Sequence, residues 1–186
     1  MSENIYQQDL DKNQANFEQL SPLSFIRRCA ELYPNYDAVI HGDITRSWKE
    51  TYDRCVKLAS ALDARGVGKG DTVAAMLPNI PEMLEVHFAV PMTGGVLNAI
   101  NTRLDARTVA FILDHAEAKV LLTDREFSAT ISEALSLLER DILVVDVDDP
   151  EFSGGELVGS MTYDDLLAES VSGYDWIMPD DEWDAI

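Results

Sequence analysis

The sequence predicts an α/β fold: a mostly parallel sheet with helices on both faces, preceded by a helix and a β-hairpin. Four short runs are mostly apolar, and segments with helical spacing of apolar residues separate them. Strands of this kind are typical of a parallel sheet, because helices cover both faces and neither side meets water. The strands are expected at 72–77, 96–100, 120–123 and 142–145, and the helices between them at 80–92, 105–116 and 126–139.

A helix and a hairpin are expected before this alternation begins. Ser21 and Pro22 suit an N-cap and a first helical position, and apolar residues then recur at helical spacing as far as Tyr33. Gly42 and Asp43 separate two short apolar runs, which predicts a tight hairpin turn. The polar first 20 residues are expected to form an extended arm.

A second helix is expected to begin at Ser47, where Ser47 and Glu50 have the spacing of a capping box. It leads into Gly66-Val67-Gly68-Lys69-Gly70, which resembles a phosphate-binding loop in composition. A Walker loop, however, runs from a strand through its glycines into a helix, so that helix amides face the phosphate. Here the order is helix, glycines, strand, and Lys69 is followed by glycine. We therefore interpret the loop as a connector, with Gly66 in left-handed backbone.

Composition and charge exclude some classes of protein. No apolar run of the 186-residue chain approaches the roughly 18 residues needed to cross a membrane. The formal net charge of −20 argues against a nucleic-acid partner, because that binding depends on basic side chains. After Arg140 the sequence has no Lys or Arg, and its many acids there are interpreted as a solvated surface. Cys29 and Cys55 fall in helical patterns, which predicts reduced, buried thiols in a cytoplasmic protein without a secretory signal.

The sequence assigns no catalytic residue and no metal ligand. His41, His87 and His115 are expected on a hairpin, a buried helix and a helix end, without the three or four converging ligands that a metal needs. His87 stands between apolar neighbours and is interpreted as a core side chain with its hydrogen bonds satisfied. Gly154 and Gly155 are interpreted as flexible positions in an acidic loop.

Acidic residues at the strand ends leave a second interpretation open. Such a set resembles the acids of a receiver domain, so a non-enzymatic binding or receiver-like signalling module is the alternative. Ordinary polarity at strand ends is the simpler explanation, and no lysine follows Lys119, although a receiver needs one on a later strand. The acids concerned are Asp124, Asp146, Asp148 and Asp149.

Arg103 is the one candidate binding residue. It follows a predicted strand and precedes a helix cap, at the edge of the sheet where ligands of open α/β folds collect. A cation there could meet a phosphate, or it could form a surface salt bridge.

Three ordered stretches together resemble the beginning of the adenylate-forming, or AMP-binding, enzymes. They are SPLSFIRRCAELYPNYDAVIHGDITRSWKETYDRCVKLASAL, GVGKGDTVAAMLPNIPEMLEVHFAVPMTGGVLNAINTRL and ILDHAEAKVLLTD. The likeness covers about residues 20–186 and is strongest to carboxylic-acid:CoA ligases for short- or medium-chain and aromatic acids.

The resemblance implies a function for the parent protein. Such enzymes activate a carboxylic acid with ATP and Mg²⁺ to an acyl-adenylate and then transfer the acyl group to CoA. It also implies that Arg103, in the NTRL segment, contacts the nucleotide phosphate of CoA.

The resemblance further implies that the chain is the first lobe of the family's N-terminal domain. The expected parts are an arm at 1–20, an α/β lobe at 21–150, and an acidic segment at 151–186 that leads toward the family's phosphate-binding loop. We expect the 186 residues alone to be inactive and to bind no ATP, CoA or Mg²⁺ tightly. The face that would pack on the rest of the domain should be apolar, which favours self-association such as a homodimer.

Overall fold

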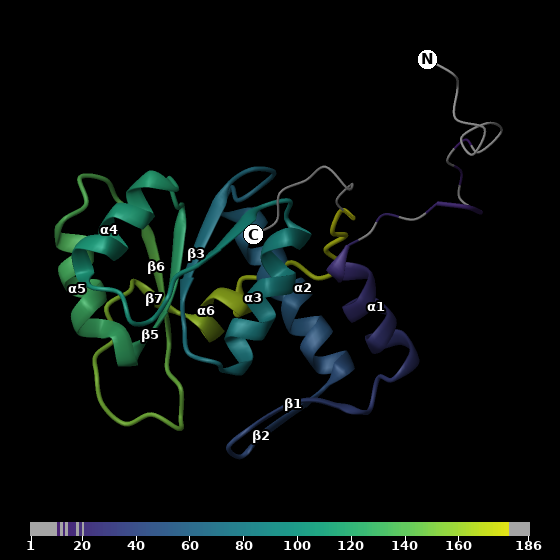
Figure 1. The fold of residues 1–186 in the computed structure, drawn as a ribbon. Coiled ribbons are helices and arrows are strands. Elements are labelled where there is room, and N and C mark those ends of the chain that lie inside the picture. The colour runs from purple at the N-terminus through teal and green to yellow at the C-terminus, as the bar shows by residue number, and fades with distance from the viewer. Residues whose placement is uncertain (1–10, 12, 14, 18, 20, 179–186) are drawn as a thin grey trace, which may run out of the picture.

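The computed structural model confirms the predicted α/β architecture and describes residues 11, 13, 15–17, 19 and 21–178. Most of the predicted arm at 1–20 therefore lies outside the described residues. A five-stranded parallel sheet has the strand order β4-β3-β5-β6-β7 (Figure 1). The strands are β3 (Thr72–Met76), β4 (Val96–Ala99), β5 (Val120–Asp124), β6 (Leu143–Val147) and β7 (Met161–Thr162).

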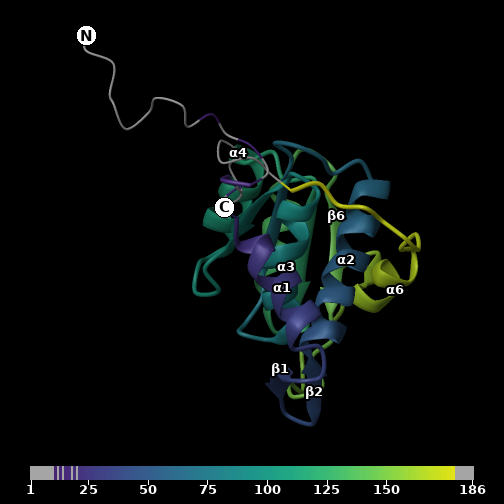
Figure 2. The ribbon, with the colours of Figure 1, turned by 90° about the vertical axis from the view of Figure 1, so that its right-hand side faces the viewer.

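Helices cover both faces of this sheet, and the sheet separates two hydrophobic cores (Figure 2). One core lies under α4 (Ala106–His115) and α5 (Ser128–Ser136). The other lies under α1 (Pro22–Leu32), α2 (Trp48–Ala64), α3 (Pro81–Met92) and α6 (Tyr163–Ala168). Strands β3 and β5 are buried along almost their whole length, because helices cover the sheet on both faces. This explains why neither strand alternates apolar and polar residues.

The N-terminal elements form largely as their sequence signals predict. The Ser21 hydroxyl accepts a hydrogen bond from the Leu23 amide and caps α1, and Ser47 and Glu50 form the capping box of α2. The hairpin pairs β1 (Asp37–His41) with β2 (Ile44–Ser47) in antiparallel register. Tyr33, expected on the inner stripe of the first helix, is instead exposed, because α1 ends one residue earlier.

The glycine-rich loop is a connector, as predicted. Gly66 and Gly70 have φ angles of 78° and 83°, which a side chain would strain, and the loop carries the chain from α2 to the start of β3. Asp71 fixes it by accepting a hydrogen bond from the Gly68 amide and pairing with Lys119 at 2.8 Å. The loop therefore lies at the amino edge of the sheet, away from the edge where ligands collect.

The segment after β6 is more ordered than its acidic composition indicated. It contains β7 and α6, neither of which the sequence predicted. Before β6, the single helix expected at 126–139 is instead a 3₁₀ turn (Arg125–Phe127) followed by the shorter α5. Gly154 and Gly155 do not form a free flexible loop, because the Arg125 guanidinium donates hydrogen bonds to both of their carbonyl oxygens. Within the described residues, no helix is long and apolar enough to span a membrane.

Candidate functional site

The carboxyl edge of the sheet is the natural place for a ligand in this topology. The first strand of the sheet along the chain is β3; the next, β4, pairs with one edge of β3, and the following strand, β5, pairs with its other edge. Ligands of open α/β sheets bind outside the strand ends at such a reversal. The loops that follow β3, β4, β5 and β6 form this edge, at 77–80, 100–105, 125–127 and 148–150.

Arg103 lies in the turn between β4 and α4, on the edge where the sequence placed it. It is exposed, and its amide donates to the Asn101 side chain at 3.0 Å. No described residue makes an ion pair or hydrogen bond with its guanidinium group, so the salt bridge considered from the sequence does not form with any described residue. Asp105 caps α4, and its hydrogen bonds with Thr108 lower the pKa of its carboxyl group. The guanidinium of Arg103 is thus open to an anion from outside this lobe.

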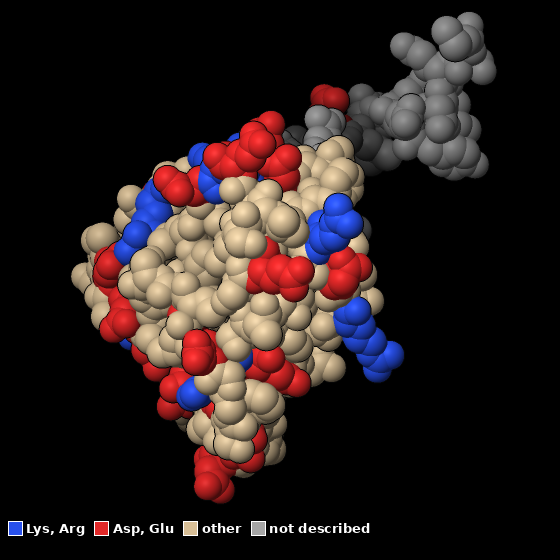
Figure 3. Space-filling view, turned by 90° about the vertical axis from the view of Figure 1, so that its left-hand side faces the viewer, with Lys and Arg blue, Asp and Glu red and all other residues tan. Residues whose placement is uncertain are grey.

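The strand-end acids do not converge on one ligand. The two oxygens of Asp146 accept the amides of Val158 and Gly159, and Asp148 pairs with Arg125. Asp149 accepts from His41 at 2.8 Å, which ties the hairpin to the loop after β6. Asp146 and Asp149 are buried, so the acidic segment after Arg140 is not uniformly solvated. Acidic side chains also lie on the face of the molecule that carries α4 and α5 (Figure 3).

Asp124 is buried at the end of β5 and has one satisfied oxygen. Its Oδ1 accepts the amide of Glu126 at 2.8 Å, while its Oδ2 has no partner among the described residues. Burial raises the pKa of this carboxyl group, and the nearby charge of Asp149 raises it further. In the described part of the chain, no group of three or more His, Cys, Asp or Glu side chains could hold a metal ion. Among the described residues, the strand-end acids therefore do not form the clustered cation site that the receiver-like interpretation expects.

A buried ionic network joins four elements and was not predicted. Glu85 on α3 is fully buried, and its two oxygens accept from Arg54 at 2.7 Å, Arg46 at 2.8 Å and the hydroxyl of Tyr163 at 2.7 Å. Burial raises the pKa of Glu85, and the two guanidinium groups oppose that shift. Burial also raises the pKa of Tyr163, which keeps its hydroxyl protonated as a donor. The network connects the hairpin, α2, α3 and α6 at one carboxylate.

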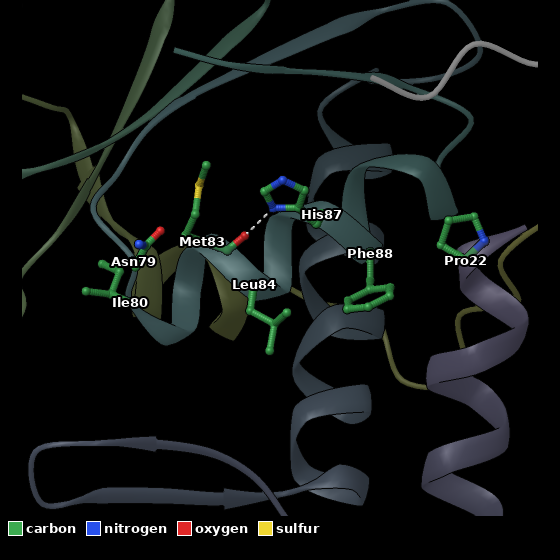
Figure 4. Close-up of a pocket in the computed structure, with 7 residues that line it drawn as sticks. All are labelled: Pro22, Asn79, Ile80, Met83, Leu84, His87 and Phe88. Carbon is green, nitrogen blue, oxygen red and sulfur yellow. Dashed lines mark hydrogen bonds between the residues drawn. The ribbon is translucent and has the colours of Figure 1, made fainter. Parts of the chain in front are cut away.

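An apolar groove runs along α3 (Figure 4). Its volume is about 560 Å³, and no Lys, Arg, Asp or Glu lines it. His87 is one of its walls and is half-buried rather than part of the core, with its Nδ1–H donating to the Met83 carbonyl at 2.7 Å. The lining residues are Pro22, Asn79, Ile80, Met83, Leu84, His87 and Phe88.

The two thiols differ in burial. Cys55 is buried in the core, which raises the pKa of its thiol, whereas Cys29 on α1 is only half-buried, contrary to the expectation from its helical pattern. Both are free cysteines.

Comparison with known proteins gives this scaffold its family. Residues 26–173 match the model of the family described as AMP-binding enzyme. The chain belongs to the AMP-binding enzyme family. It is 44% identical over 190 residues to an acetate/butyrate–CoA ligase of Arabidopsis thaliana named as peroxisomal, and 41% identical to an acetate–CoA ligase of Humulus lupulus. Each alignment covers 96% of this chain but only 33% and 34% of the relative, so the chain spans about a third of the length of these curated relatives.

Solved structures of proteins named as CoA ligases share the fold. An anthranilate–CoA ligase crystallised with anthranoyl-AMP superposes with a TM-score of 0.80 at 18% identity, over 92% of this chain and 32% of that one. A putative long-chain-fatty-acid–CoA ligase from Rhodopseudomonas palustris gives 0.71 at 25% identity, over 88% and 39%. The α/β lobe of this chain therefore has the same fold as part of each of these two structures.

Sequence reasoning missed the ionic network and the His41–Asp149 contact. A signal for the network was present, because Glu85 is a charged residue in the middle of a helix whose other residues are mostly apolar. Its partners lie 31 to 78 residues away, and no local pattern indicates such pairings. His41 and Asp149 are 108 residues apart.

Proposed function

We propose that the protein to which this chain belongs is an acid–CoA ligase. It would join a carboxylic acid to CoA in two steps, with ATP consumed to AMP and pyrophosphate and an acyl-adenylate between them. The observation that carries this proposal is the 44% identity, over nearly the whole chain, to an acetate/butyrate–CoA ligase. Relatives named as benzoate– and 2-methylpropanoate–CoA ligases extend the range of acids, so the substrate is proposed as a short-chain, branched or aromatic acid.

The described residues do not by themselves fit ATP and Mg²⁺. The glycine-rich loop lies at the amino edge of the sheet. At the carboxyl edge Asp146, Asp148 and Asp149 bind amides, Arg125 and His41, and one buried oxygen of Asp124 has no partner among the described residues. Nucleotide activation needs amide donors, a cation and a metal around the phosphates. We therefore propose that this lobe serves as scaffold, is inactive alone and binds these cofactors only as part of the longer protein. For CoA, in contrast to ATP and Mg²⁺, the chain contributes one candidate contact, the guanidinium group of Arg103.

The test is thioester formation by the full-length protein. Purified protein is incubated with ATP, Mg²⁺, CoA and one of acetate, butyrate, 2-methylpropanoate or benzoate, and acyl-CoA is measured by mass spectrometry. The proposal expects acid-dependent acyl-CoA and one AMP for each thioester. AMP formation without thioester, with every acid, would contradict the ligase assignment. The cytoplasmic location stays a prediction, which imaging of the tagged full-length protein would check.

A further inference from the structure

The tip of the β1–β2 hairpin lies beside the loop that follows β6, and both segments line an acidic cleft (Figure 1). The cleft has a volume of about 280 Å³, and His41 is the one basic side chain among its lining residues. The carboxylates that line it come from α3, from β6 and the loop after it, and from α6. They belong to Glu82, Asp146, Asp148, Asp149 and Asp164.

All of these carboxylates except that of Asp149 have partners that do not titrate in the neutral pH range. They form ion pairs with arginines, whose guanidinium groups keep their protons in proteins, or accept backbone amides. The pairs are Glu82 with Arg46 and Arg54, Asp164 with Arg54, Asp148 with Arg125, and Asp146 with the amides of Val158 and Gly159.

Asp149 differs because its counter-charge is an imidazole. Its side chain is only 8% exposed, and its Oδ1 lies 2.8 Å from Nε2 of His41 and accepts the amide of Glu151 at 3.0 Å. Among the described residues, no Lys or Arg forms an ion pair with it. A second buried acid is close, since burial and then the charge of Asp149 raise the pKa of the Asp124 carboxyl group. Imidazoles in general change charge between about pH 5 and 8, so the cation that faces this buried carboxylate is one that neutral pH can remove.

The His41–Asp149 contact joins the tip of the hairpin to the loop after β6. On β2, Arg46 anchors the hairpin to Glu85 of α3 at 2.8 Å, whatever the charge of the imidazole. At the turn, Asp43 is exposed, and the Glu151 side chain lies so close that a Cβ at Gly42 would be 2.0 Å from its Oε1. Because a two-stranded hairpin by itself is marginally stable, the order of its tip depends on the contacts with the loop.

We propose that His41 and Asp149 form a pH-sensitive latch between the tip of the hairpin and the loop after β6. While the imidazole is protonated, its hydrogen bond to the carboxylate is charge-assisted, and such bonds are roughly twice as strong as neutral ones. When the pH rises and the imidazole loses its proton, the bond becomes a neutral one and the carboxylates of the cleft face no cation from the hairpin tip. The latch is therefore closed at mildly acidic pH and opens more often as the pH rises. Residues 148–150 form part of the carboxyl edge of the sheet, so an open latch loosens one wall of the candidate site.

The test is amide hydrogen exchange in the full-length protein at about pH 6 and about pH 8, measured by peptide mass spectrometry and corrected for the intrinsic exchange rate at each pH. Peptides that cover 37–47 and 148–152 report on the latch, and β3 is the internal reference for the whole fold. His41→Gln replaces the imidazole by an amide that donates a hydrogen bond but carries no charge. His115→Gln is the matched control, because His115 is exposed on α4, across the sheet from α3.

In the wild type, protection at 37–47 and 148–152 should be about fivefold lower at pH 8 than at pH 6, the difference between a charge-assisted and a neutral hydrogen bond. His115→Gln should keep this change, whereas His41→Gln should show the lower protection at both pH values. Equal protection at both pH values in the wild type, or a fivefold change that persists in His41→Gln, would overturn the proposal. A loss of the same size in β3 would also overturn it, since the effect would then belong to the whole fold.

A second measurement needs no variant and decides the question if His41→Gln does not fold. Hydrogen exchange at the C2 position of each imidazole, followed on peptides of the wild type, gives the titration midpoint of each histidine. The fall in protection at 37–47 should follow the midpoint of His41, and a fall that follows another histidine or none would contradict the latch. Neither measurement uses ligase activity, so failure of the latch and failure of the proposed function are distinguishable.

Discussion

The Nε atom of Arg54 on α2 lies 2.7 Å from Oε1 of Glu85 on α3, inside the core that supports the carboxyl edge of the sheet. The same carboxylate also receives Arg46 from the hairpin and Tyr163 from α6. One carboxylate on α3 therefore contacts side chains from three other elements. Removing one partner of a buried ion pair is costly, because the other charge remains buried without compensation.

Replacing Glu85 should destabilise the chain strongly. Glu85→Gln places a neutral amide against two guanidinium groups, while Glu82 remains within 3.5 Å of both, and we expect a loss of about 2 kcal/mol in the free energy of unfolding. The control is Asp53→Asn, which breaks the exposed i,i+4 pair with Lys49 and should cost no more than about 0.5 kcal/mol. Urea denaturation measures both, and equal losses would show that the network contributes no more than a surface pair.

The loop that Arg125 holds should not tolerate a side chain at Gly155. This glycine has a φ angle of 65°, and an added Cβ would lie 2.0 Å from the carbonyl oxygen of Arg125. Gly173→Ala is the matched control, since its φ of 78° carries a similar backbone strain but no atom lies within 4 Å of the added Cβ. We expect Gly173→Ala to cost about 1 kcal/mol and Gly155→Ala at least about 2 kcal/mol more. Thermal unfolding checks this, and a similar loss in both variants would mean that the loop moves aside freely.

Asp71 should contribute an acid-sensitive part of the stability. Its hydrogen bond with Lys119 lowers the pKa of its carboxyl group below 3.8 in the folded chain. A lowered pKa means that the unfolded chain binds the proton more readily, so this stability is present above about pH 4 and is lost as the pH falls through the folded pKa.

The substitution Asp71→Asn should lower the free energy of unfolding by about 1 kcal/mol at pH 7, and this free energy should then fall less steeply with decreasing pH below about pH 4. Denaturant titrations at a series of pH values measure the slope. Asp43→Asn, in the exposed hairpin turn, is the control and should leave the slope unchanged. An unchanged slope in Asp71→Asn would show that the Lys119 pair is not formed in solution.

Arg103 should affect the use of CoA in the full-length protein. If its guanidinium contacts a phosphate of CoA, Arg103→Ala should raise the KM for CoA by about tenfold, the loss of one charge-assisted hydrogen bond, and leave the KM for ATP unchanged. Arg107→Ala, also exposed and four residues along the chain, is the control. A parallel rise in both KM values would indicate a general effect on the fold, and no rise in the KM for CoA would remove Arg103 from the site.

The sequence predicted the elements whose signals are local. The capping box of α2, the proline at the start of α1, the turn at Gly42 and the four apolar strands all depend on residues within a few positions of one another. It did not predict β7 or α6, because β7 has only two residues and its sequence lies in an acidic stretch with no apolar run. The capping box at Thr162 and Asp165 was the one local signal for α6.

The candidate site was harder to predict than the fold. Arg103 could be placed at the carboxyl edge because its position depends only on the order of strand and helix. The partners of Glu85, Asp149 and Arg125 depend on which distant segments the topology brings together, and a single sequence does not contain that information. His87 shows the same limit: its apolar neighbours indicate burial, but only the three-dimensional arrangement shows that it lines an open groove.

The most direct test of the central claim compares pyrophosphate release by the 186-residue chain and by the full-length protein, with ATP, Mg²⁺ and butyrate. The account predicts acid-dependent release from the full-length protein and none above background from the short chain. Acid-dependent pyrophosphate release from the 186 residues alone would contradict it, because these residues would then contain the phosphate-activating groups that we place elsewhere in the protein.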